Sequence, residues 1–155
     1  MKAQIWSTDF VISIVIFFSV FALLIFSINN ISSQNEIKRN FEDINNKISI
    51  VSESLVRTKG LPENWNSSNV ILIGLASEEN ILNETKLNEF NNTEYQKIKE
   101  IFGYDFYFNL TDSLNGTIYL EKGLQPPSNA NLVVPVERYC LYRDRLVNLK
   151  LIFWI

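Results

Sequence analysis

Residues 4–30 read QIWSTDFVISIVIFFSVFALLIFSINN, and this stretch decides the fold. Its nineteen residues from Phe10 to Ile28 contain no charge and no proline. A transmembrane helix needs about 20 apolar residues, whereas the apolar core of a secretory signal has about 7–15. Residues 27–40, SINNISSQNEIKRN, at and beyond the end of this run, contain no A-x-A-like cleavage site. The sequence therefore predicts a helix that stays in the membrane.

The helix is predicted to extend well beyond the membrane. Apolar residues recur after the apolar run at alternating spacings of four and three, at Ile37, Phe41, Ile44, Ile48, Val51 and Leu55. Such a stripe is typical of a helix that is apolar on one side. No proline or glycine interrupts the pattern before Gly60, so we predict one helix from Ile5 to Arg57. Its amphipathic half is expected to pack on the chain's own globular domain, with a free coiled coil as the alternative.

One acidic residue, Asp9, lies at the N-terminal edge of the apolar run. A carboxylate there costs less than one at the centre of a membrane helix, where insertion scales give about 2.5–3.5 kcal/mol, but it still needs a partner. Two interpretations stay open. Ser7–Asp9 can form a helix N-terminus, where an acid interacts favourably with the helix dipole. Alternatively, another subunit supplies a cation.

After Gly60 the pattern changes from a helix to mixed elements. Val70–Leu75, VILIGL, has the length of a strand, and residues 76–103 are expected to form two helical pieces. The second piece has Thr93 and Gln96 at the spacing of a capping box and places Tyr95, Ile98 and Phe102 on one face. Two hairpins follow, 104–122 and 132–155, joined by a loop with Pro126 and Pro127. The predicted class is α+β: a long helix on a mostly antiparallel sheet.

Composition excludes several classes of function. The net charge is −3 and no basic stripe is present, so we expect no nucleic-acid partner. The chain has no histidine, and its one cysteine, Cys140, lies in an apolar run where it is interpreted as a small buried residue. We therefore predict that the protein is not an enzyme and holds neither a cofactor nor a metal ion. A surface enzyme anchored to the membrane is the less favoured alternative.

The motif N-x-[ST], which marks candidate glycosylation sites, occurs six times and always after the apolar run. The asparagines are Asn30, Asn66, Asn83, Asn91, Asn109 and Asn115. Such motifs indicate an exposed chain outside the cell if a glycosylating machinery exists. Base-composition bias combined with polar loops is the alternative explanation.

The N-terminal region contains Lys2, then Ala3 and Gln4, then Asp9 and a long apolar helix that becomes amphipathic. In these features it resembles archaeal type IV pilin-like proteins. It implies that a membrane prepilin peptidase cuts between Ala3 and Gln4. It also implies that an acidic side chain, here Asp9, neutralises the new amine of a neighbouring subunit, and that the helices bundle into a filament.

Together these observations predict three parts: a leader over 1–3, a transmembrane and amphipathic helix over 4–57, and an extracellular pilin-like head domain over 58–155. The candidate residues for contact between helices in the membrane are Asp9, Ser13, Ser19 and Ala22. The expected function is that of a structural subunit of a surface filament, as a minor pilin with lipid and other pilin-like subunits as partners. The alternative is a single-pass anchored module outside the cell that binds a ligand or senses a signal.

Overall fold

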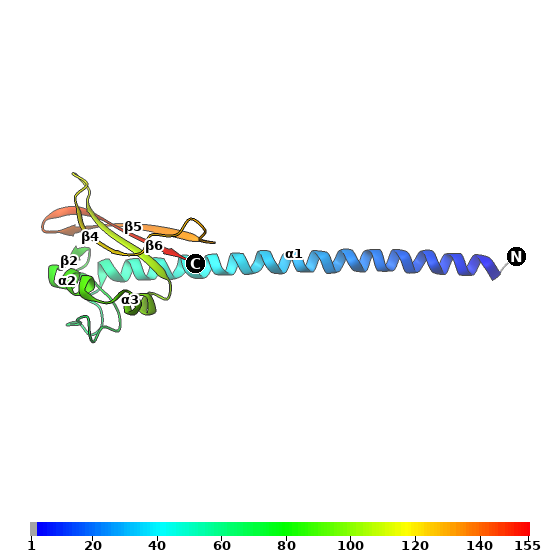
Figure 1. Ribbon diagram of the computed structural model, residues 1–155, viewed down its shortest axis with the longest axis horizontal. Coiled ribbons are helices and arrows are strands. Elements are labelled where there is room, and N and C mark those ends of the chain that lie inside the picture. The colour runs from blue at the N-terminus through cyan, green and yellow to red at the C-terminus, as the bar shows by residue number, and fades with distance from the viewer. Residues whose placement is uncertain (1–2) are drawn as a thin grey trace. The chain divides into compact units, whose positions relative to one another are not determined.

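The computed structural model describes the backbone of residues 3–155 and the side chains of residues 8–28 and 38–155 (Figure 1). The first element is helix α1 (Ala3–Arg57), which confirms the predicted helix and its end at Arg57. The chain divides into two compact units, Met1–Asn40 and Phe41–Ile155. The second unit, called the head unit below, begins inside α1. The last turns of the helix are therefore part of the head unit's own fold.

The head unit is α+β, as the sequence predicts. Its further helices and strands are β1 (Ala76–Glu78), β2 (Ile81–Leu82), α2 (Glu84–Asn92), α3 (Tyr95–Phe102), β3 (Asp105–Asp112), β4 (Ile118–Gly123), β5 (Val133–Tyr142) and β6 (Arg145–Trp154). Both predicted C-terminal hairpins are confirmed, because β3 pairs with β4 and β5 pairs with β6, each antiparallel.

The strands form one curled, mixed sheet. Within the described chain it has six strands in the order β1-β2-β5-β6-β3-β4. Its pairs are antiparallel apart from β2 with β5, which meet in parallel at Ile81 and Leu141. Beyond that contact β5 has no described strand on its outer side, and Pro135 lies in this open stretch. A residue without a backbone N–H fits there, because an edge strand leaves alternate N–H groups unpaired.

The amphipathic stripe of α1 packs into the core of the head unit. Ile44, Ile48 and Leu55 have no exposed surface, and they share one apolar cluster with residues from the inner face of the sheet. The prediction that the stripe packs on the chain's own domain is thereby confirmed. Phe41 departs from it, because 48 % of its surface is exposed at the first residue of the head unit. The side chain of Ile37 lies outside the described residues.

Strand β3 supplies the centre of this core. Phe106, Phe108 and Leu110 are fully buried, as their alternation with polar residues predicts. Phe108 meets Phe90 of α2 with ring centroids 4.9 Å apart, and Phe106 meets Phe102 of α3 at 5.1 Å. The two short helices are therefore fixed to the sheet by edge-on aromatic contacts, a geometry that aromatic pairs prefer.

The predicted strand at Val70–Leu75 is wrong. The segment makes an isolated bridge between Leu61 and Leu72 and is otherwise irregular. The last N–H of the segment and the one after it bond at the end of α1: Leu75 N donates to Leu55 O at 2.9 Å, and Ala76 N donates to Thr58 O, just beyond the helix, at 3.1 Å. The last carbonyls of a helix lack partners within the helix. These hydrogen bonds to the end of α1, together with the burial of Ile73 and Leu75, outweigh the preference of the segment for a strand.

The helical prediction for residues 76–103 is corrected at two places. Residues 76–82 form the short strands β1 and β2, and α2 begins only after Asn83, whose side chain accepts a hydrogen bond from Lys86 N. The predicted capping box at Thr93 is also wrong. Thr93 ends α2, where its hydroxyl donates to Glu89 O at 2.7 Å, and Glu94 precedes α3 without a side-chain cap bond. The buried face of α3 and its stop at Gly103 (φ 85°) are as predicted.

Candidate functional site

The apolar segment, defined as Thr8–Ile28, is the part of α1 that is long and apolar enough to cross a membrane. It has 21 residues, and no residue of its most apolar window is buried inside the described protein. Its large side chains are correspondingly exposed, for example Phe10 at 66 % and Leu23 at 67 %. A helix that is apolar on all sides needs an apolar environment on all sides.

Two of the predicted contact residues are already hydrogen-bonded within their own helix. Ser13 Oγ donates to Asp9 O at 2.8 Å, and Ser19 Oγ donates to Val15 O at 2.8 Å. This is the usual way in which a serine satisfies its hydroxyl in an apolar helix. Each hydroxyl oxygen keeps the capacity to accept a further hydrogen bond. No described residue pairs with the Asp9 carboxylate, which is exposed.

Helix geometry separates the four predicted contact residues into two groups. At about 100° per residue, Ser13 lies about 40° from Asp9, so these two share one side. Ser19 and Ala22 lie about 80° and 140° from Asp9 in the other direction. Ser27, which was not among the predicted contact residues, follows Asp9 by 18 residues. Five full turns bring Ser27 back to the line of Asp9, so it lies on the same side of the helix as Asp9 and Ser13.

The leader residues precede the side chains that the structure describes. Ala3 and Gln4 lie in the first turn of α1, and their side chains are outside the described set. Lys2 lies outside the described residues altogether.

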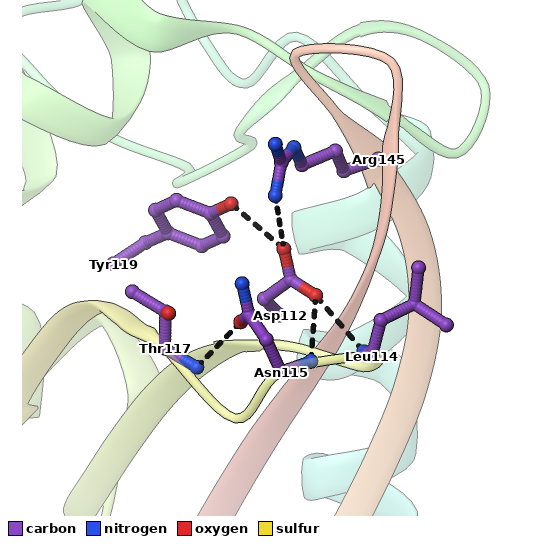
Figure 2. A network of polar contacts seen from close by, with 6 residues as sticks. All are labelled: Asp112, Leu114, Asn115, Thr117, Tyr119 and Arg145. Carbon is purple, nitrogen blue, oxygen red and sulfur yellow. Dashed lines mark hydrogen bonds and ion pairs between the residues drawn. The ribbon is translucent and has the colours of Figure 1, made fainter.

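In the head unit, the turn between β3 and β4 is held by a buried carboxylate (Figure 2). Asp112 is 2 % exposed, and its Oδ1 accepts hydrogen bonds from Leu114 N at 2.9 Å and Asn115 N at 3.3 Å. Its Oδ2 accepts from the Tyr119 hydroxyl at 3.0 Å and pairs with Arg145 Nη1 at 3.3 Å. The Leu114 N–H, followed by the other donors, lowers the pKa of Asp112, so the group is ionised at neutral pH.

The five sequons with described side chains occupy different environments. Asn66 and Asn115 lie exposed in loops between elements, and Asn83 is the N-cap of α2. Asn91 is exposed near the end of α2, whereas Asn109 lies half-buried inside β3. The side chain of Asn30 is outside the described residues.

Cys140 is buried on the inner face of the sheet, as the sequence predicts. It is 2 % exposed, and burial raises the pKa of its thiol to about 12. The thiol is therefore protonated at neutral pH and is a poor nucleophile. Among the described residues, no group of three His, Cys, Asp or Glu side chains is placed to hold a metal ion.

No family model, no curated protein and no solved structure matches the chain.

Proposed function

We propose that this protein is a structural, membrane-anchored, pilin-like subunit of an archaeal type IV pilus or a related surface filament, and a minor pilin. One observation carries the proposal. A single helix, α1, contains both a 21-residue apolar segment whose most apolar window has no buried residue and, further along, the stripe that packs into the core of the head unit. The anchor and the folded head unit thus share one continuous element.

A filament subunit needs this arrangement for a physical reason. The exposed side chains of the apolar segment must be covered by lipid before assembly and by neighbouring helices after it. A helix that is also part of the head unit's core cannot be drawn out of that unit without exposing Ile44, Ile48 and Leu55. Forces on the helix bundle are therefore transmitted to the head unit through packed side chains.

The N-terminal residues support the same proposal. Lys2 and Gln4 match the pattern of a pilin precursor, with Ala3 in the place where glycine is usual. Asp9 becomes the sixth residue of a chain that starts at Gln4. Asp9 and Ser13 lie on one side of the helix, and we propose that this side meets the neighbouring pilin-like subunit. The head unit lies outside the cell, and Lys2 stays inside, in agreement with the positive-inside rule.

Disulfide cross-linking in the native membrane tests the contact between subunits. A cysteine at Ser13 should form an intermolecular disulfide with another copy or with a second pilin-like chain that carries a cysteine at the same place. Phe18→Cys is the matched control, because residue 18 lies about 140° around the helix from residue 13. Cys140 does not interfere, because it is buried.

We expect the Ser13→Cys adduct to exceed the Phe18→Cys adduct, and Asp9→Ala to reduce it by about fivefold, which corresponds to about 1 kcal/mol of contact energy. Equal cross-linking at the two positions would mean that the helix has no preferred side. Recovery of monomer alone would contradict the filament proposal and leave a single anchored domain outside the cell.

A further inference from the structure

The five described sequons fall into two geometric classes. In the first class, the backbone N–H of the third sequon residue donates to the asparagine side chain. Ser68 N donates to Asn66 Oδ1 at 2.9 Å, and Thr117 N donates to Asn115 Oδ1 at 2.9 Å. This local ring, an Asx turn, brings the hydroxyl-bearing residue close to the carboxamide. Both hydroxyl-bearing residues, Ser68 and Thr117, are exposed.

In this class, the side-chain amide nitrogen of the asparagine makes no hydrogen bond to a described residue. No described residue accepts a hydrogen bond from Nδ2 of Asn66 or of Asn115. Both asparagines are exposed. A modifying enzyme can therefore reach the nitrogen and the hydroxyl of the same motif together, without opening any element of the fold.

In the second class, the other three described sequons, side chains of the sequon make hydrogen bonds within a helix or strand. Asn109 lies in β3, where its Nδ2 donates to the Tyr107 hydroxyl at 3.3 Å and its Oδ1 accepts from Thr111 Oγ1 at 2.6 Å.

The sequons at Asn91 and Asn83 take part in the end and the start of helix α2. The hydroxyl of the Asn91 sequon belongs to Thr93, which is 1 % exposed and bonded to Glu89 O. Asn83 caps α2 through Lys86 N at 3.2 Å, so its sequon is wound into the first turn of the helix.

Both loops of the first class are held in shape by further hydrogen bonds, local ones at Asn115 and distant ones around Asn66. Asp112 accepts from Asn115 N and so fixes the backbone of the first sequon residue (Figure 2). Around Asn66, Glu89 accepts from Ser67 N at 2.9 Å, and Lys97 Nζ donates to Ser67 O at 2.9 Å and to Ser68 O at 2.6 Å. The Asx turns are therefore part of the folded structure.

We propose that Asn66 and Asn115 are the N-glycan acceptors of the folded head unit, and that Asn83, Asn91 and Asn109 are not modified once the head unit has folded. The sugar donor is an oligosaccharide on a polyprenyl phosphate or pyrophosphate. The asparagine Nδ2 attacks the anomeric carbon and forms the C–N bond. The bond from that carbon to the phosphate oxygen breaks, the phosphate keeps the electron pair, and Nδ2 loses one proton. This modification in cells rests on the proposed location of the head unit outside the cell.

A reaction with purified components tests the acceptor assignment without relying on that location. The full chain is produced in a host without N-glycosylation and purified in detergent. It is then incubated with a single-subunit oligosaccharyltransferase and a polyprenyl-pyrophosphate oligosaccharide. Mass spectrometry measures occupancy at each sequon, and synthetic peptides that span the same five sequons serve as unfolded acceptors.

We expect all five peptides to accept the sugar, whereas the folded chain is modified at Asn66 and Asn115 about tenfold more than at Asn83, Asn91 and Asn109, which react only through local opening. Thr117→Ala removes the hydroxyl but keeps the N–H, and should abolish modification at Asn115. Thr111→Ala is the matched control and should leave occupancy at Asn66 and Asn115 unchanged.

Two results would overturn the assignment: similar occupancy of Asn109 and Asn115 in the folded chain, or no occupancy of Asn66 and Asn115 while their peptides react. Failure of the proposed exterior location has a different signature. In that case the reaction with purified components still favours Asn66 and Asn115, but protein isolated from its native membrane carries no glycan.

Discussion

Replacing Ile48 with alanine should lower the free energy of unfolding of the head unit by about 3 kcal/mol, because it removes a fully buried side chain and leaves a cavity. Ile48 has no exposed surface and lies in the cluster shared by α1 and the inner face of the sheet. The effect is measured by urea unfolding of the full chain in detergent. The fluorescence of Trp65 and Trp154, both buried, reports the loss of the fold.

The matched control lies two residues along the same helix. Ile50 is 67 % exposed, so Ile50→Ala should change the unfolding free energy by about 0.5 kcal/mol or less. The pair separates packing from helix propensity, because both variants make the same chemical change in one element. Equal effects of the two substitutions would show that this part of α1 is not built into the core of the head unit.

Gly74→Ala should destabilise the head unit by about 3 kcal/mol, at the upper end for overpacked sites. A Cβ at residue 74 would overlap backbone atoms of Gly60 and Thr58, which have no room to move because they follow directly on the end of α1. The same close approach explains why residues 70–75 leave the strand conformation to cover that helix end. Urea unfolding again provides the measurement.

Gly116→Ala distinguishes this steric effect from ordinary glycine preference. Gly116 has a positive φ of 72°, but nothing lies within 4 Å of a Cβ placed there. Only the backbone preference is lost, at about 1 kcal/mol. If Gly116→Ala were as damaging as Gly74→Ala, the close packing behind α1 would not be what stabilises this region.

The sequence predicted the elements whose signal is local. The apolar run and its absence of helix breakers were enough to predict α1, and the alternation of Phe106, Phe108 and Leu110 was enough to predict β3. The wrong predictions involve partners distant in the sequence. Residues 70–75 have the composition of a strand, but Leu75 N bonds to Leu55 O at the end of α1, and Ile71 N and Leu72 N bond to Leu61 O, which periodicity does not reveal.

For the candidate site too, the sequence predicted local motifs but not the contacts that depend on the fold. The motif N-x-[ST] identified the six asparagines from sequence, but the bonds of Asn109 to Tyr107 and of Asn115 to Thr117 depend on the turn and strand that each residue occupies. The prediction for Thr93 was wrong for a similar reason. Its spacing to Gln96 suggested a helix start, yet the residue is buried at the end of α2 because its hydroxyl bonds back to Glu89.

The most direct test of the central claim is the N-terminal residue of the protein extracted from its native membrane, determined by mass spectrometry of the N-terminal peptide and of the intact chain. If α1 is the shared anchor of a pilin-like subunit, the chain begins at Gln4 and retains the whole apolar segment. A chain that begins beyond Ile28 would contradict the anchor, and a chain that retains Met1 would contradict processing as a pilin.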